Sequence, residues 1–287
     1  MNIIGVTLIV LVTIGFSVAV LFSKVSLKEM RPERFTMYYI FGAVVVMTIE
    51  VIAIRPKIGI GYLWNQDLII ILISSIFGAV AYFFGYIGLK GTFAGISSTI
   101  FNLQGLLITF IGAIAYRIFP GYNILFGLLV SLFGLYLIGI KGLNKTKIKV
   151  DKSFIFLTLS PVLWALEWVC FSFVSSTSPI FYTYLLYSFI FLLLFIVNVA
   201  FVKKSSAEHR NMKMLAIYGG FFSGLGNAAY GIFISEYGTA LTGVITILSV
   251  PVSVILAIII LRERYTKIEL VGIVAVFIGL MIALVHY

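Results

Sequence analysis

The sequence predicts an all-α integral membrane protein whose ten transmembrane helices form two inverted five-helix repeats. Three observations carry this prediction. Ten apolar stretches fill nearly the whole 287-residue chain, and about 20 apolar residues in a helix cross the roughly 30 Å hydrocarbon core of a bilayer. Apolar residues make up 62% of the chain and charged residues 10%, which is too few charges for a soluble protein of this size. The second half of the chain also resembles the first.

The apolar stretches are separated by short polar turns. The first stretch begins beside the N-terminus without a basic leader or a small-residue cleavage site, so we expect a retained helix rather than a signal peptide. The turns after the third and eighth stretches are very short, and short connections make consecutive helices antiparallel. The predicted spans cover residues 2–23, 35–54, 68–89, 93–116, 122–140, 154–174, 181–201, 214–234, 240–261 and 268–285.

An internal repeat relates the two halves of the chain. A basic linker at residues 141–153 separates a first repeat at residues 1–140 from a second at residues 154–287. The aligned positions include Tyr82 with Tyr230, Gly91 with Gly238, Gly127 with Gly272, and Gly134 with Gly279. Because each repeat has an odd number of spans, the second must enter the bilayer inverted, as in secondary transporters with a substrate site near the midplane. Chance similarity between apolar helices is the alternative.

The basic residues predict the orientation in the membrane. Of the 20 Lys and Arg residues, 17 lie in loops that follow odd-numbered spans. Cytoplasmic loops carry the excess of Lys and Arg, so we expect these loops in the cytoplasm and both termini outside. The net charge of +10 is then a consequence of membrane topology rather than of nucleic-acid binding. We expect a multi-pass protein of the plasma membrane.

An acidic residue near the middle of the sixth span is the clearest candidate for a functional group. Glu167 shares one helix face with Trp164, Trp168 and Phe171. A charge inside a bilayer costs about 2.5 kcal/mol or more, so such a residue usually faces a cavity or a partner. A carboxylate between two indoles could hold a cationic amine by charge and cation–π attraction, or could carry a coupling proton. A structural Glu bonded to a neighbouring helix, with packed indoles, is the alternative.

Uncharged polar side chains on other spans complete the predicted substrate site. They are Tyr82 and Tyr86 on the third span, Asn102 and Gln104 on the fourth, and Asn227 and Tyr230 on the eighth. Interhelical hydrogen bonds, worth about 0.6 kcal/mol each, are the alternative explanation for the amides. Three tyrosines at the start of the seventh span are expected in an aromatic belt at the membrane interface. They are Tyr182, Tyr184 and Tyr187.

The C-terminal stretch carries a family resemblance. Pro251 lies in the ninth span, Leu261, Glu263 and Arg264 follow at its end, and Gly272 and Gly279 lie in the tenth span. This arrangement resembles the signature of the EamA-like branch of the drug/metabolite transporter superfamily, whose members are ten-span transporters. The resemblance implies structural or gating roles for Pro251, Glu263, Gly272 and Gly279. It also implies cytoplasmic termini, which is the opposite of the orientation that the basic residues predict.

The sequence lacks the residues that several kinds of chemistry require. The lone cysteine, Cys170, excludes an intramolecular disulfide. The sequence has no Cys/His ligand spacing and no nucleotide-binding motif, so we expect neither a metal nor a cofactor. No Asp lies within a predicted span and no His lies mid-span, which disfavours an intramembrane enzyme.

We therefore expect a secondary active transporter that works by alternating access, with proton coupling. Its substrate is a small polar or amphipathic metabolite, and an amino acid or organic amine is the leading interpretation. Because the chain contains both halves of the repeat, a functional monomer is expected. A non-transporting membrane receptor or scaffold is the main alternative, and an intramembrane enzyme is less favoured.

Overall fold

The structure is a computed structural model that describes residues 3–55, 66–117, 121–145, 152–174, 178–201 and 210–284. Within these ranges the chain forms helices and turns, without a strand. The helices are α1 (Ile3–Ser26), α2 (Pro32–Ile54), α3 (Gln66–Gly91), α4 (Ala94–Phe101), α5 (Leu103–Ala115), α6 (Tyr122–Lys145), α7 (Lys152–Ser172), α8 (Pro179–Phe201), α9 (Arg210–Ile245), η2 (Thr246–Leu248), α10 (Ser249–Ile260) and α11 (Lys267–Leu284). Part of the predicted linker, residues 146–151, lies outside the described residues.

Six of the described helical stretches are long and apolar enough to cross a membrane. They are Ile3–Ser26, Pro32–Ile54, Gln66–Gly91, Ala94–Ala115, Ser153–Ser172 and Pro179–Ala200. Large apolar side chains also cover the outside of the bundle, and Ile52 and Val199, for example, are 66% and 70% exposed. Soluble proteins rarely present so much apolar surface to water. The chain is therefore a multi-pass membrane protein.

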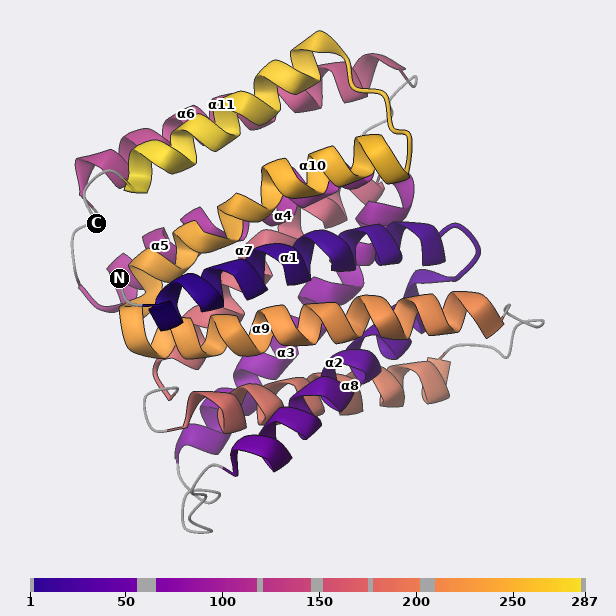
Figure 1. The fold of residues 1–287 in the computed structure, drawn as a ribbon, viewed down its shortest axis with the longest axis vertical. Helices are drawn as coiled ribbons and strands as arrows, with labels where there is room; N and C mark the ends of the chain where they lie inside the picture. The colour runs from indigo at the N-terminus through magenta and orange to yellow at the C-terminus, as the bar shows by residue number, and fades with distance from the viewer. Residues whose placement is uncertain are drawn as a thin grey trace.

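The helices form one bundle in which α6 and α11 pack side by side at one edge, and α2 and α8 pack together at the other (Figure 1). Between these edges α1 packs against α9, α3 packs against α7, and α4 packs against α10. The core of buried apolar side chains runs through these central pairs. The helices between the two edges thus enclose the space in which a site can form.

Two of the predicted spans are interrupted part-way. The fourth consists of α4 and α5, which meet at Asn102, and the ninth contains η2 and α10. Pro251 lies in the first turn of α10, where its missing N–H removes no bond within that helix. The predicted turn between the eighth and ninth spans falls at Gly238 within α9. Its φ of 76° is a conformation that glycine adopts without a Cβ clash.

Helices α2 and α9 touch backbone to backbone because glycines face each contact. A Cβ atom at Gly42 would overlap the carbonyl oxygen of Ile217, and a Cβ atom at Gly220 would overlap the carbonyl oxygen of Tyr39. Small residues allow this close approach of membrane helices. The contact fixes the position of Tyr39 relative to α9.

Candidate substrate cavity

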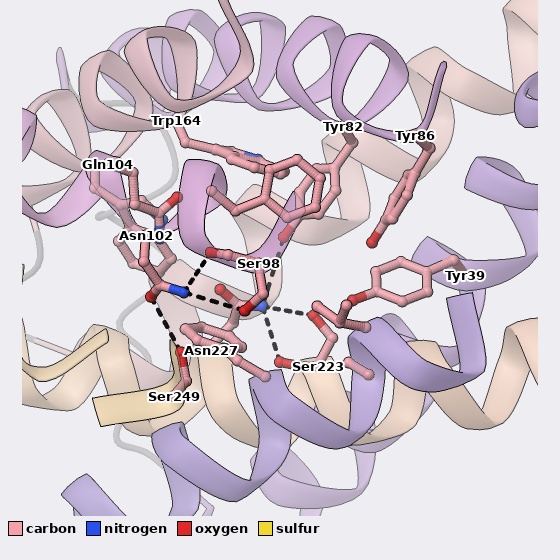
Figure 2. A pocket seen from close by; sticks show the side chains of 15 residues that line it. Tyr39, Tyr82, Tyr86, Ser98, Asn102, Gln104, Trp164, Ser223, Asn227 and Ser249 are labelled. Atoms are coloured by element: carbon pink, nitrogen blue, oxygen red, sulfur yellow. Dashed lines mark hydrogen bonds between the residues drawn. The ribbon is translucent and has the colours of Figure 1, made fainter. Parts of the chain in front are cut away.

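A cavity of about 570 Å³, part of it open to solvent, lies between helices from both halves of the chain. Figure 2 shows the 15 side chains that line it. They are Phe16, Ala19, Val20, Tyr39, Tyr82, Tyr86, Ser98, Phe101, Asn102, Gln104, Trp164, Trp168, Ser223, Asn227 and Ser249. None of these lining residues carries a formal charge.

One wall of the cavity is aromatic. The Tyr82 ring meets the Trp164 ring edge-on, with centroids 5.2 Å apart, and stacks on Tyr86 at 6.1 Å. Tyr39 packs edge-on against Tyr86 at 5.0 Å, and Phe101 packs edge-on against Trp164 at 5.0 Å. Such ring pairs add about 0.5–1.5 kcal/mol each beyond area burial. The rings therefore hold one another in place and present a preformed surface to a ligand.

Amides and hydroxyls lie across the cavity from Trp164 and Tyr82 (Figure 2). The Asn227 side-chain N–H donates to the carbonyl oxygen of Ser223 at 2.8 Å and to its hydroxyl at 2.9 Å. It also lies 3.5 Å from the Tyr82 hydroxyl. The Asn102 side-chain oxygen, Oδ1, accepts a hydrogen bond from the Ser249 hydroxyl at 3.0 Å. These bonds fix the orientation of both amides and connect α4 with α10.

The cavity wall also has hydrogen-bonding capacity for a ligand. The Trp164 indole N–H has no partner among the described residues, although a buried polar group normally has one. The Gln104 side chain lies at the wall and is half-buried. The cavity therefore offers ring faces together with neutral donors and acceptors.

Glu167 lies behind the cavity wall in this conformation. Its side chain is fully buried, and its carboxyl oxygens have no hydrogen-bond partner within the described part of the chain. A Cβ atom at Gly78 would lie 2.7 Å from the Glu167 Oε1 atom and 2.6 Å from the Ile190 Cδ1 atom. The carboxyl group thus occupies the space that Gly78 leaves on α3. The Ser74 hydroxyl donates to the Glu167 backbone carbonyl at 2.5 Å and joins α3 to α7 at this level.

The structure brings together seven of the nine residues predicted from the sequence to bind substrate. They are Tyr82, Tyr86, Asn102, Gln104, Trp164, Trp168 and Asn227. The other two, Glu167 and Tyr230, are buried behind the wall, where Tyr230 packs edge-on against Trp168 with ring centroids 4.7 Å apart. Contact of these nine residues with a substrate stays a prediction.

Several residues of the cavity wall were not predicted from the sequence, among them Tyr39, Ser98, Ser223 and Ser249. Tyr39 follows Tyr38 near the start of a span, a position that is typical of an interfacial aromatic belt. Serines are common wherever membrane helices touch, so their presence alone does not indicate a cavity. Ser249 could have been predicted from the repeat alignment, because it aligns there with Asn102.

Glu263 joins two distant parts of the chain at one end of the bundle. Its carboxylate accepts hydrogen bonds from the backbone N–H groups of Ala94 at 2.7 Å and Gly95 at 3.3 Å, and from the Tyr265 hydroxyl. Burial raises the pKa of Tyr265, and the bond to Glu263 acts in the same direction, so this hydroxyl stays protonated and remains a donor. A carboxylate at the start of a helix also interacts favourably with the helix dipole. Glu263 therefore caps α4.

Lys24 binds the other side of the same turn. Its ammonium group donates to the carbonyl oxygens of Leu89 at 2.9 Å, Lys90 at 3.3 Å and Thr92. These carbonyls lie at the C-terminal end of α3, where a positive charge is favourable. The α3–α4 turn is thus held by a cation on α1 and an anion after α10.

A family model described as the EamA-like transporter family matches residues 3–140 and, separately, residues 151–285. The chain belongs to the EamA-like transporter family. The match confirms the resemblance that the C-terminal signature indicated. It places the chain among membrane transporters of the drug/metabolite type, which agrees with the expectation of a protein that is not an enzyme.

The fold of this EamA-like protein also occurs in a solved structure. One crystal structure is similar over 98% of this chain and 95% of its own chain, with a TM-score of 0.66 and 17% sequence identity. At this identity the likeness shows a shared fold. No curated protein matches the chain in sequence.

Proposed function

We propose that this EamA-like protein is a secondary active transporter that moves a small polar or amphipathic metabolite by alternating access, coupled to protons. The observation that carries the proposal is the preformed cavity between the two halves, with an aromatic wall on one side and amides on the other. An amino acid or organic amine is the leading substrate class. Aromatic faces attract ammonium groups by about 0.5–2 kcal/mol each, and the neutral amides can bond the rest of the molecule.

Ten spans in two inverted repeats, at residues 1–140 and 154–287, are part of this proposal. Reciprocal contacts between α6 and α11 support them. In the alignment Gly127 corresponds to Gly272 and Gly134 corresponds to Gly279. A Cβ atom at Gly279 would lie 2.5 Å from the Gly127 carbonyl oxygen, and one at Gly134 would lie 2.6 Å from the Gly272 carbonyl oxygen. In these two contacts the aligned glycines exchange roles, which is typical of elements related by a two-fold axis.

Other equivalent positions also support a two-fold relation. Asn102 aligns with Ser249 at the same offset as Gly91 with Gly238, and the two side chains bond to each other. Arg117 and Arg262 are separated by the same offset as Gly127 and Gly272, and both have positive φ, at 55° and 54°. The α1 helix begins and the α11 helix ends at the same face of the bundle (Figure 1), as an even number of crossings requires.

Glu167 is the proposed site of the coupling proton. It is a fully buried acidic group, one layer behind Trp164 and Trp168. A buried charge without a partner is costly, so gain or loss of a proton at this site has to be accompanied by a change in its surroundings. Such a requirement can tie protonation to the exchange between conformations.

The Lys24 and Glu263 contacts are the proposed gate at one end of the cavity. Basic side chains gather at this end, including Lys28, Arg262 and Arg264, and their loops are those that the basic residues assign to the cytoplasm. We therefore infer that this conformation is closed toward the cytoplasm of a plasma-membrane protein that works as a monomer. Opening would require the α3–α4 turn to leave both partners.

A thermal-shift screen tests the substrate class. We expect small amines and amino acids to raise the melting temperature of the detergent-purified protein, because a ligand that binds the folded state stabilises it by mass action. The Trp164→Leu variant should lose at least tenfold in affinity, because it loses a ring face and an N–H donor. Phe84→Leu is the matched control, since Phe84 packs on Phe156 away from the cavity. Stabilisation by organic anions alone would contradict the amine assignment.

Solute flux separates a transporter from a receptor. We expect a compound identified by the screen to enter proteoliposomes saturably, and to accumulate when a proton gradient is imposed. A receptor or scaffold would bind the compound without moving it. Binding with no flux above that of empty liposomes would therefore reject the transport proposal.

If Glu263 is part of a gate, its substitution should increase the access of a thiol reagent to the cavity. A Ser98→Cys reporter on the cavity wall, in a Cys170→Ala background, would react with an impermeant thiol reagent added from the Glu263 side. We expect Glu263→Gln to speed the reaction at least threefold, because the substitution removes the negative charge at the α4 terminus. Glu269→Gln is the control: Glu269 caps its own helix through the Thr266 N–H at 2.5 Å. Equal rates in both variants would reject the gate.

A further inference from the structure

Tyr187 of α8 is a buried tyrosine with no place in the cavity wall. Its side chain is fully buried, so the expected position in an aromatic belt is wrong for this residue. Its hydroxyl lies 2.5 Å from the Tyr82 hydroxyl, and the two rings meet edge-on with centroids 6.0 Å apart. Tyr82 does line the cavity. The pair therefore connects the cavity to the interior of the α3–α7–α8 contact.

The same contact contains the Glu167 carboxyl group. This group lies against Gly78, and the Ile190 Cδ1 atom approaches the same glycine. Tyr82 follows Gly78 by one turn on α3, so it shares a helix face with the glycine that touches Glu167. Tyr187 precedes Ile190 by one turn on α8, so it shares a face with the side chain that approaches the same glycine. Both tyrosines interact electrostatically with the Glu167 carboxyl group. The hydroxyl pair thus adjoins the cavity through Tyr82 and responds to the charge on Glu167.

The titratable groups around Glu167 are few. They are Tyr82 on α3, Tyr187 on α8, Tyr230 on α9 and Cys170 on α7 itself. Helices α4 and α5, which also pack against α7, contain no Asp, Glu, His, Lys, Arg, Cys or Tyr. Hydroxyl dipoles are therefore the groups that respond to the charge on Glu167, since no cation faces it among the described residues.

We infer that Tyr187 is a positioning residue for proton coupling, which links the Tyr82 hydroxyl at the cavity to the charge on Glu167. This inference rests on the proposed function. Each phenol has one hydrogen, so either Tyr82 or Tyr187 donates in their shared bond. An ionised Glu167 attracts hydroxyl hydrogens and a neutral one does not, so its charge favours one direction of the bond. When Tyr187 donates, the Tyr82 hydrogen is free to bond a ligand in the cavity.

Carbodiimide labelling of Glu167 tests this inference without a known substrate. Dicyclohexylcarbodiimide reacts with protonated carboxyl groups in membranes, and mass spectrometry of the full-length protein gives the labelling rate across a range of about pH 5 to 9. Tyr187→Phe removes one hydroxyl and keeps the ring. We expect the midpoint of the labelling profile to move up by about one pH unit, because a hydroxyl dipole that can orient toward the ionised carboxylate is lost. Tyr82→Phe should move it in the same direction.

Tyr184→Phe is the matched control, because it makes the same change on α8 at a half-buried residue that packs on Phe181. Its midpoint should equal that of the wild type, and Glu167→Gln should abolish labelling at this position. If Tyr187→Phe folds and its labelling profile has the same midpoint as that of the wild type, the inference is overturned and the proposed function is left intact. If the labelling of Glu167 in the wild-type protein does not vary with pH, proton coupling at Glu167 is overturned, and this inference is overturned with it.

Discussion

Glu167→Gln is expected to abolish pH-dependent transport while the protein still folds and binds its substrate. Glutamine has nearly the same shape as glutamic acid but cannot lose a proton. It fits the space beside Gly78 without the cost of a buried charge. In proteoliposomes the variant should allow downhill flux, and a proton gradient should no longer drive accumulation. We expect the gradient-driven component to fall at least 100-fold, a difference of about 2.7 kcal/mol.

Glu50→Gln is the control for this experiment, because Glu50 is also an acidic residue within a helix and does not line the cavity. It should leave coupling unchanged. Gradient-driven accumulation by Glu167→Gln at the wild-type level would show that the coupling group lies elsewhere. Loss of downhill flux as well would indicate a structural role for Glu167 rather than a role in coupling.

Gly220→Ala is expected to destabilise the protein, because it adds a methyl group at the contact between α2 and α9. The new Cβ atom would overlap the Tyr39 carbonyl oxygen, and neighbouring atoms of the Tyr39 backbone leave it no space. Overpacking of a rigid contact costs about 1–3 kcal/mol, and a clash with backbone belongs at the upper end of this range. The melting temperature in detergent should fall, and substrate binding should weaken because Tyr39 lines the cavity.

Gly91→Ala provides the matched control, since Gly91 is also helical. A Cβ atom there would meet Ser153 at 3.7 Å, an ordinary contact. This variant should be as stable as the wild type or slightly more stable, because alanine favours helix over glycine. A melting temperature for Gly220→Ala as high as that of Gly91→Ala would show that α2 and α9 can separate without cost.

The candidate site was predictable where polar residues stand out against an apolar background. Asn102, Gln104 and Asn227 are unusual within membrane spans, and all three line the cavity. Tyr39 and Tyr187 were not predictable in the same way. A tyrosine near the end of a span satisfies the membrane interface as readily as it satisfies the interior, so its sequence position leaves the choice open.

The sequence by itself determined the all-helical membrane class, the positions of the apolar stretches and the family, because length and apolar composition are local properties that a bilayer requires of every span. Only the tertiary structure decided that Glu167 faces Gly78 behind the cavity, and that Glu263 caps a helix 169 residues away. The physical reason is that lipid tails are as apolar as the side chains that pack between the helices. Both faces of a membrane helix are then apolar, and the hydrophobic pattern does not reveal which face meets which neighbour.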